Sequence, residues 1–217
     1  MASKYKLNTV IFDFDGTIVD STNIKTEAFA FLYKDHKPEI VKQVINYHIQ
    51  NQGLSRYEKF KYFQSILLKK KYSKKIESKL DKEFSSYVFE RVVKSNYIEG
   101  AKEFLYQYHK ILNFYLISAT PDAELKKIIE LKKIKHCFKE IYGSPIDKGQ
   151  AILKILKDNN IENNKTLVIG DSLSDLEGAK KANVSFLAIS LELNSNIFKK
   201  EVKFINNFNN LIDYLKY

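Results

Sequence analysis

Val10-Ile11-Phe12-Asp13-Phe14-Asp15-Gly16-Thr17 joins an apolar run to two carboxylates and a glycine turn. The run begins at Leu7 and is typical of a buried parallel strand that ends where the aspartates begin. Carboxylates at a buried strand end are costly unless a cation or dense hydrogen bonding compensates them, so the stretch indicates a metal site. Asp15-Gly16-Thr17 also fits a plain turn with an Asx residue, and both interpretations stay open here.

A second apolar strand followed at once by carboxylates lies further along the chain, in Leu167-Val168-Ile169-Gly170-Asp171-Ser172-Leu173-Ser174-Asp175. The carboxyl ends of parallel strands gather at one edge of a sheet, where ligands bind. We therefore expect Asp171 to face Asp13. Alternatively, Asp171 or Ser174 caps the helix that follows, whose N-terminus favours acidic residues.

Two polar positions between these strands fit a site for an anion. Lys148 opens a predicted helix, where the helix dipole disfavours a cation, and a bound phosphate would explain its position. Ser118, in Phe114-Tyr115-Leu116-Ile117-Ser118-Ala119-Thr120-Pro121, supplies a hydroxyl and free backbone N–H groups where a strand meets a helix. The alternatives are a solvated lysine and an ordinary Ser/Thr-Pro helix start.

The chain has two patterns of apolar spacing. Between residues 23 and 94 apolar residues recur with helical spacing, and no strand pattern interrupts them. After Gly100, short apolar runs alternate with helical patterns. The predicted strands are 114–117, 138–142, 166–169, 186–189 and 202–205, and the predicted helices are 99–108, 122–133, 149–159 and 173–182. This order predicts an α/β fold with a parallel sheet and a helical insertion after the first strand.

Composition narrows the class of protein. A length of 217 residues fits one domain that carries a smaller insertion. The single cysteine, Cys137, forms no internal disulfide, and neither a signal peptide nor a membrane span is evident, so we expect a reducing, cytoplasmic location.

The net charge is +10, and residues 56–82 hold ten basic and three acidic residues. We interpret that segment as a solvated helical face, and the alternative is that it steers an anionic ligand.

Taken in chain order, the Asp-x-Asp-Gly-Thr loop at Asp13, the strand-end Ser118, Lys148 at a helix start and the Gly-Asp-x-x-x-Asp loop at Asp171 resemble four active-site motifs of one family. That family is the haloacid dehalogenase-like superfamily, in its phosphoglycolate phosphatase and beta-phosphoglucomutase branch. The resemblance covers the whole chain. It implies a Rossmann-like catalytic core of residues 1–20 and 96–217 and an all-helical cap of residues 21–95.

The resemblance further implies a Mg²⁺-dependent phosphatase that acts on a small phosphorylated metabolite, such as a phosphosugar or a phosphoglycolate-like compound. Asp13 would attack phosphorus to form an aspartyl-phosphate, and Asp15 would act as general acid and then general base. By the same resemblance, the residues that hold Mg²⁺ are Asp13, the carbonyl of Asp15, Asp171 and, in support, Asp175. Those that bind the phosphoryl oxygens are Ser118, Lys148 and the amides of Gly16 and Ala119.

Gly53-Leu54-Ser55-Arg56 is a candidate substrate-binding segment in the predicted cap. The glycine permits a tight turn, Ser55 can cap the next helix, and Arg56 then projects from its first turn. Cap loops of related enzymes carry substrate contacts, so Arg56 is predicted to bind the substrate. A solvated arginine is the alternative.

Four other functions compete with a phosphatase. Dehalogenases and phosphonate-cleaving members of the family lack an aspartate at the position of Asp15, which argues against both. A sugar phosphomutase uses the same four motifs and remains an alternative. A basic nucleic-acid-binding protein has only the charge in its favour, because no recognised binding motif is present. We expect no nucleic-acid or membrane partner, and a monomer is compatible with the sequence.

The remaining candidate groups are interpreted as structural. The four histidines show no metal-ligand spacing and are expected on helix surfaces or in packing. They are His36, His48, His109 and His136. The tyrosines and phenylalanines of the predicted cap recur at helical spacing, which favours a core over a base-stacking platform.

Overall fold

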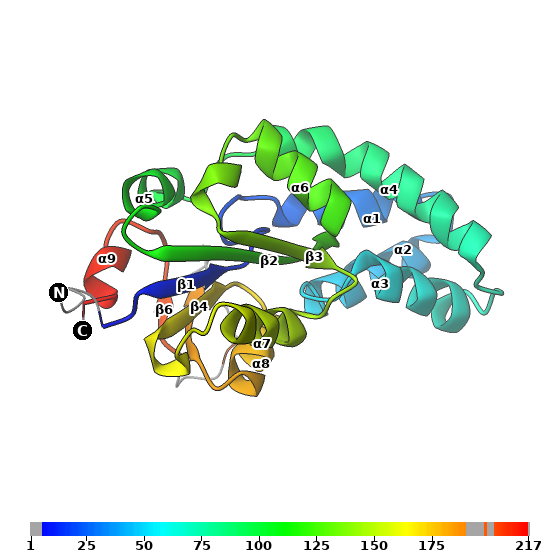
Figure 1. The fold of residues 1–217 in the computed structure, drawn as a ribbon. Coiled ribbons are helices and arrows are strands. Elements are labelled where there is room, and N and C mark those ends of the chain that lie inside the picture. The colour runs from blue at the N-terminus through cyan, green and yellow to red at the C-terminus, as the bar shows by residue number, and fades with distance from the viewer. Residues whose placement is uncertain (1–5, 190–197, 199–201, 217) are drawn as a thin grey trace.

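The structure is a computed structural model that describes residues 6–189, 198 and 202–216, and its centre is a six-stranded parallel sheet. The strand order is β3-β2-β1-β4-β5-β6 (Figure 1). The strands are β1 (Thr9–Phe12), β2 (Asn113–Pro121), β3 (Glu140–Ser144), β4 (Thr166–Gly170), β5 (Ser185–Ile189) and β6 (Phe204–Ile205). This arrangement confirms the predicted α/β class and the parallel sheet.

Helices flank this sheet and extend beyond one end of it. They are α1 (Thr22–Leu32), α2 (Pro38–Gln50), α3 (Arg56–Tyr62), α4 (Lys74–Lys94), α5 (Ala101–Tyr108), α6 (Asp122–Leu131), α7 (Lys148–Asp158), α8 (Leu173–Lys181) and α9 (Leu211–Tyr214). A π-helical turn, Phe63–Leu67, continues α3. None of the helices in the described residues is long and apolar enough to cross a membrane.

The central strand β1 alternates its side chains between two apolar layers. Phe12 packs on one face against an aromatic cluster, and its ring centroid lies 5.1 Å from that of Phe114. Ile11 packs on the other face with residues of α7 such as Ile152. Helices α5, α6 and α9 cover the first face and α7 and α8 the second (Figure 1). Burial on both faces explains why this strand has no alternating polar positions.

The register of the sheet determines which residues meet at its carboxyl edge. Phe12 is paired with Leu116 of β2 on one side and with Ile169 of β4 on the other. The residues that follow these three positions therefore lie near one another at the carboxyl edge of the sheet. Strand β1 is shorter than the apolar run from Leu7 to Phe14, because the backbone leaves the sheet after Phe12. Asp13 still donates its backbone N–H to the carbonyl of Ile169, at 2.9 Å.

Helices α1 to α4 lie together beyond the carboxyl end of the strands (Figure 1), and we call them the cap helices. Their core is aromatic, with centroids of Phe29 and Phe84 4.6 Å apart and Phe60 and Phe63 packed beside them. The predicted apolar face of α4 is buried from Leu80 onwards. Because these phenylalanines are fully buried, they cannot stack on nucleic-acid bases.

The cap helices are joined to the sheet by two segments that run side by side. Asp20 donates its backbone N–H to the carbonyl of Asn96 at 3.0 Å, and Ile98 donates to the carbonyl of Ile18 at 2.9 Å. Lys132, directly after α6, braces the second segment, since its ammonium donates to the carbonyl of Ser95 at 2.8 Å. These crossings lie at the predicted boundaries, although the division into a core and a cap domain stays a prediction.

Candidate active site

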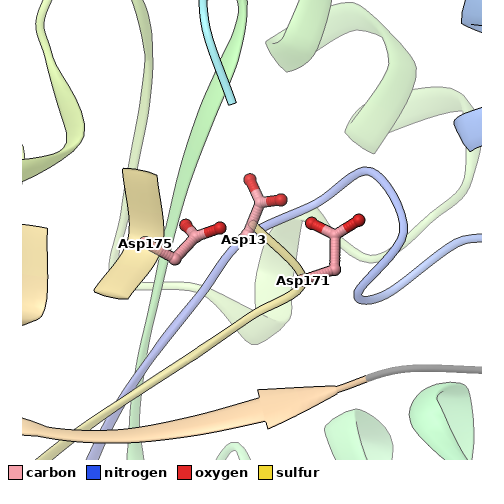
Figure 2. Close-up of side chains that lie close together, drawn as sticks. All are labelled: Asp13, Asp171 and Asp175. Atoms are coloured by element: carbon pink, nitrogen blue, oxygen red, sulfur yellow. The ribbon is translucent and has the colours of Figure 1, made fainter. Parts of the chain in front are cut away.

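Three aspartates converge at the carboxyl edge of the sheet (Figure 2). Asp13 follows β1, Asp171 follows β4 directly, and Asp175 comes from the first turn of α8. One carboxylate oxygen from each lies within 4.8 Å of the other two. The expectation that Asp171 faces Asp13 is confirmed.

Lys148 lies against two of these carboxylates. Its ammonium is 3.0 Å from Asp13 Oδ1 and 2.7 Å from Asp175 Oδ1. All three side chains are buried. Burial disfavours the charge of Lys148, but Asp13 and Asp175 outweigh burial and hold the pKa of this ammonium above its usual range. The two carboxylates therefore explain why a lysine occupies the first position of α7, against the helix dipole.

Asp175 is held by the N-terminus of its own helix. Ser172, the N-cap of α8, donates its hydroxyl to Asp175 Oδ2 at 2.5 Å and its backbone N–H to the same oxygen at 3.2 Å. The alternative in which Asp171 or Ser174 caps this helix is wrong, because Ser172 occupies that position. Asp171 is thereby left free to turn its carboxylate toward Asp13.

Among the described residues, Asp171 has no hydrogen-bond donor and no cationic partner, although its carboxylate is enclosed. It lies directly against Gly16, whose positive φ of 75° suits glycine and where a Cβ would overlap the carboxylate. Burial, with Asp13 and Asp175 as like charges, raises the pKa of Asp171 well above its usual range. Burial also raises the pKa of Asp13 to about 7, against the lowering effect of Lys148.

The charges of this cluster do not balance without a cation. Three carboxylates face one ammonium, so two negative charges are left over in a buried space when all are ionised. Oxygen-rich sites of this kind suit hard divalent cations such as Mg²⁺. The donor set and the unpartnered carboxylate of Asp171 therefore fit such an ion.

Asp15 occupies a different environment, rich in donors. Lys25 of α1 lies 2.5 Å from Asp15 Oδ2, and Thr120 donates to the same oxygen at 2.9 Å. Ser21 donates to Asp15 Oδ1 at 2.7 Å, and Ser118 donates to Oδ2 at 3.3 Å. Burial alone would raise the pKa of Asp15, but Lys25 and these hydrogen bonds lower it below its usual value.

A narrow cavity lies between the sheet edge and the cap helices. Its lining brings together residues predicted from separate motifs, namely Asp13, Asp15, Ser118, Ala119, Lys148 and Asp171. Gly16 and Asp175 stand behind this surface, against Asp171 and Lys148 respectively.

The cap helices close over this cavity. Gly53, in the turn before α3, lies so close to Ser174 that a Cβ would overlap the serine hydroxyl. Ser174 donates to the carbonyl of Gly53 at 3.4 Å. A wider cleft beside this contact, lined by Ser55 and Tyr57 of the cap and by Lys148 of the core, leads in from the surface.

Arg56 joins the cap helices to the core. Its guanidinium forms an ion pair with Glu124 of α6 through Nη2 and Oε1, and another with Asp81 of α4 at 3.2 Å. Ser85 accepts a further hydrogen bond at 2.6 Å, and the guanidinium carbon lies 4.6 Å from the centroid of Phe84. Ser55 does cap α3 as predicted. The substrate-binding role of Arg56 stays a prediction, since these groups occupy its donors here.

The cap contributes four residues that the sequence analysis did not identify as functional. Thr22, Lys25, His48 and Gln52 line the cavity above the aspartates. Lys59 lies behind His48 and is only 2% exposed, so treating residues 56–82 as a solvated face is wrong for it and for Arg56. The other basic residues of that segment are exposed. Helical spacing in the sequence could have indicated that Arg56 and Lys59 are buried, because both share one face of α3 and its continuation with Phe63.

The family model described as haloacid dehalogenase-like hydrolase matches residues 10–189. No curated protein matches this chain. A predicted phosphoglycolate phosphatase from Haemophilus somnus is 18% identical, with a TM-score of 0.75 and coverage of 99% of both chains.

Two further structures share this architecture. YfnB of Bacillus subtilis, described as a HAD hydrolase bound to magnesium, is 18% identical, with a TM-score of 0.72 and coverage of 98% of this chain and 100% of that one. CbbY of Rhodobacter sphaeroides, in complex with xylulose-1,5-bisphosphate, is 12% identical, with a TM-score of 0.72 and coverage of 93% and 95%. At these identities the likenesses establish the fold.

Proposed function

From the premise that this chain belongs to the haloacid dehalogenase-like hydrolase family, we propose that it is a Mg²⁺-dependent phosphatase of small phosphorylated metabolites. The observation that carries the proposal is the cluster of Asp13, Asp171 and Asp175 beside Lys148, in which Asp13 and Asp175 are buried and Asp171 is half-buried. Asp13 stands within this cluster and beside Asp15, so a nucleophile, a proton carrier and cation ligands lie in one cavity. The cytoplasm is the location that we propose.

Asp13 is the nucleophile in this proposal. One carboxylate oxygen attacks phosphorus, the bond from phosphorus to the ester oxygen breaks, and an aspartyl-phosphate forms. Water then attacks the phosphorus of this intermediate, which releases inorganic phosphate and restores the carboxylate. The ion pair with Lys148 holds the carboxylate of Asp13 in place and favours its ionised form.

Asp15 carries the proton in both steps. It protonates the leaving alkoxide in the first step and accepts a proton from the attacking water in the second. The contact with Lys25 favours the ionised carboxylate, which suits the second step. The first step needs a proton on Asp15, and the negative charge of an arriving phosphate works in that direction.

The cation ligands in this proposal are Asp13, the carbonyl of Asp15, Asp171 and, in support, Asp175. When bound, Mg²⁺ supplies positive charge that lets an anionic nucleophile approach an anionic phosphate. Ser118 and Lys148 bind the phosphoryl oxygens, with the amides of Gly16 and Ala119 as further donors. These donors act in a closed cavity, where a fixed dipole stabilises developing charge more strongly than in water.

A sugar phosphomutase remains the second candidate, and the contact of Gly53 with Ser174 favours it. A cap that closes over the nucleophile keeps water from the aspartyl-phosphate, so the phosphoryl group can pass to another hydroxyl. Phosphorus NMR separates the two functions. Conversion of a hexose 1-phosphate to the 6-phosphate with a bisphosphate primer indicates a mutase, and release of inorganic phosphate without isomerisation indicates a phosphatase.

The test of the proposed function is phosphate release from a panel of phosphorylated metabolites, including phosphosugars and phosphoglycolate. We expect turnover with Mg²⁺, none after treatment with EDTA, and recovery when Mg²⁺ is restored. Equal turnover with and without the metal contradicts the proposal. Salt-sensitive retention of DNA together with no metal-dependent turnover would instead support a nucleic-acid-binding protein.

A further inference from the structure

The carboxylate of Asp15 is held from two parts of the molecule at once. Its Oδ2 accepts hydrogen bonds from Thr120 and Ser118, which belong to β2 at the sheet edge. The same oxygen pairs with Lys25 of the cap helix α1, and Oδ1 accepts a hydrogen bond from Ser21, the N-cap of that helix. Because donors act on both oxygens, they fix the plane of the carboxylate as well as its position.

Lys25 is the cation among these four partners. Besides its contact with Asp15 at 2.5 Å, its ammonium donates to the hydroxyl of Thr120 at 3.0 Å, and this hydroxyl in turn donates to Asp15 at 2.9 Å. The three groups therefore form a closed triangle in which each contacts the other two. The side chains of Lys25 and Asp15 are 19% and 13% exposed, so little water competes with these contacts.

Ser118 would leave this arrangement during the proposed reaction. Its hydroxyl carries one proton, which points to Asp15 in this structure at 3.3 Å and would be given to a phosphoryl oxygen of the substrate. The backbone N–H of Thr120 holds the serine oxygen at 3.0 Å, and this contact leaves the hydroxyl proton free to turn. With a substrate bound, Asp15 Oδ2 then depends on Lys25 and Thr120.

Lys25 also stands on the side from which the leaving group departs. In an in-line displacement at phosphorus, the leaving oxygen points away from the nucleophile. Asp13 lies at the sheet edge, so that oxygen faces the cap helices, and Lys25 and Asp15 both line the cavity between the two. A lysine of α1 is thus placed to hold Asp15 where the ester bond breaks.

We propose that Lys25 is a positioning residue for Asp15, which holds the carboxyl group in the orientation that gives a proton to the leaving oxygen and takes one from the attacking water. This inference rests on the proposed phosphatase function and deepens it by adding a cap residue to the acid-base machinery. The ammonium of Lys25 is already engaged by Asp15 and Thr120, and phosphate binding falls to Lys148 and Ser118. Lys25 therefore acts on the rate of bond breaking more than on substrate affinity.

The first experiment replaces Lys25 by methionine, which keeps a long side chain and removes the ammonium. With Mg²⁺ and the best alkyl phosphate, kcat should fall by about 10-fold to 150-fold, the value of a charged hydrogen bond, while KM stays within about threefold. Release of p-nitrophenol in the first turnover should change less than threefold, because a good leaving group needs little protonation. Lys42→Met, an exposed cap lysine, should change none of these values.

Three results of this experiment overturn the inference. Equal losses for the alkyl and aryl esters, or a raised KM with kcat unchanged, make Lys25 a ligand of the phosphate. An unchanged kcat for the alkyl ester gives it no role in the reaction. Circular dichroism shows whether the variant is folded. If Lys25→Met does not fold, Lys25→Gln, which keeps a polar side chain without the charge, is measured in the same way.

The second experiment adds Lys25→Met to Asp15→Asn. If Lys25 acts through Asp15, the double variant should hydrolyse the alkyl ester within about threefold of Asp15→Asn alone, because the two changes are coupled. A further loss as large as that of Lys25→Met by itself overturns the inference. Absence of phosphate release by the wild-type protein contradicts the proposed function itself, whereas wild-type turnover with an unaffected Lys25→Met contradicts the role of Lys25 alone.

Discussion

Buried charged side chains are paired differently at the sheet edge and in the cap helices. At the sheet edge, Lys148 has two carboxylate partners, and the surplus charge is negative around Asp171. In the cap helices, Arg56 has two carboxylate partners while Lys59, three residues later, has none among the described residues. A bound cation would balance the surplus charge of the sheet edge. In the cap helices, Arg56 provides attachment to the core, whereas Lys59 is buried without a carboxylate partner in the described residues.

The largest effect is expected at the nucleophile. Asp13→Asn removes the attacking oxygen, and we expect the rate of p-nitrophenyl phosphate hydrolysis to fall by about 10⁴-fold or more. Lys148 keeps Asp175 as a partner, so the fold should persist. Phosphate release measures the first effect and far-ultraviolet circular dichroism the second. Turnover near that of the wild type would rule out Asp13 as the nucleophile.

Asp15→Asn should have the next largest effect, a loss of about 10²-fold to 10⁴-fold with an alkyl phosphate. Release of p-nitrophenol should slow less in the first step, because a good leaving group needs little protonation. The measurement is the rate for both leaving groups, with the exposed Asp20→Asn as control. An unchanged rate for the alkyl ester would refute the acid-base role.

Asp171→Asn tests the surplus negative charge directly. Loss of a residue that only supports a metal ligand lowers metal affinity by about 10-fold to 100-fold. Because Asp171 is proposed as a ligand itself, its replacement should raise the Mg²⁺ concentration for half-maximal activity by at least that factor. In EDTA at pH 8 the same variant should be more stable than the wild type by about 0.5–2 kcal/mol, because a buried, unpartnered charge is removed. Urea unfolding measures this difference. Lower stability in EDTA would show that the carboxylate has a partner without the metal.

The smallest effect on catalysis is expected at the bridge between cap and core. Glu124→Gln leaves Arg56 with Asp81 and Ser85, so we expect a loss of about 1–3 kcal/mol of stability and only a few-fold change in kcat/KM. Glu130→Gln, an exposed glutamate of the same helix, should have little effect on either. If Glu124→Gln changes neither stability nor activity, Arg56 does not fasten the cap.

The two regions also differ in how far their roles follow from the sequence. At the sheet edge, Asp13 and Asp171 each end an apolar strand, and parallel pairing alone brings strand ends together, so their meeting was predictable. In the cap, the burial of Lys59 and of His48 depends on how α2 and α3 pack on α1. The four-residue spacing puts Lys59 on the same helix face as Phe63, but nothing in the sequence shows which other helix covers that face.

The paired backbone crossings between Asp20 and Asn96 and between Ile18 and Ile98 bear on how the cap moves. Two adjacent segments tied to each other by backbone hydrogen bonds bend as one unit, so these crossings favour a bending motion of the cap helices over a twist. Lys25 lies one helical turn beyond the crossings, whereas the Gly53 turn lies far along the chain from both. Such a bend would displace the Gly53 turn from Ser174 before it parted Lys25 from Asp15, the residue proposed as acid and base.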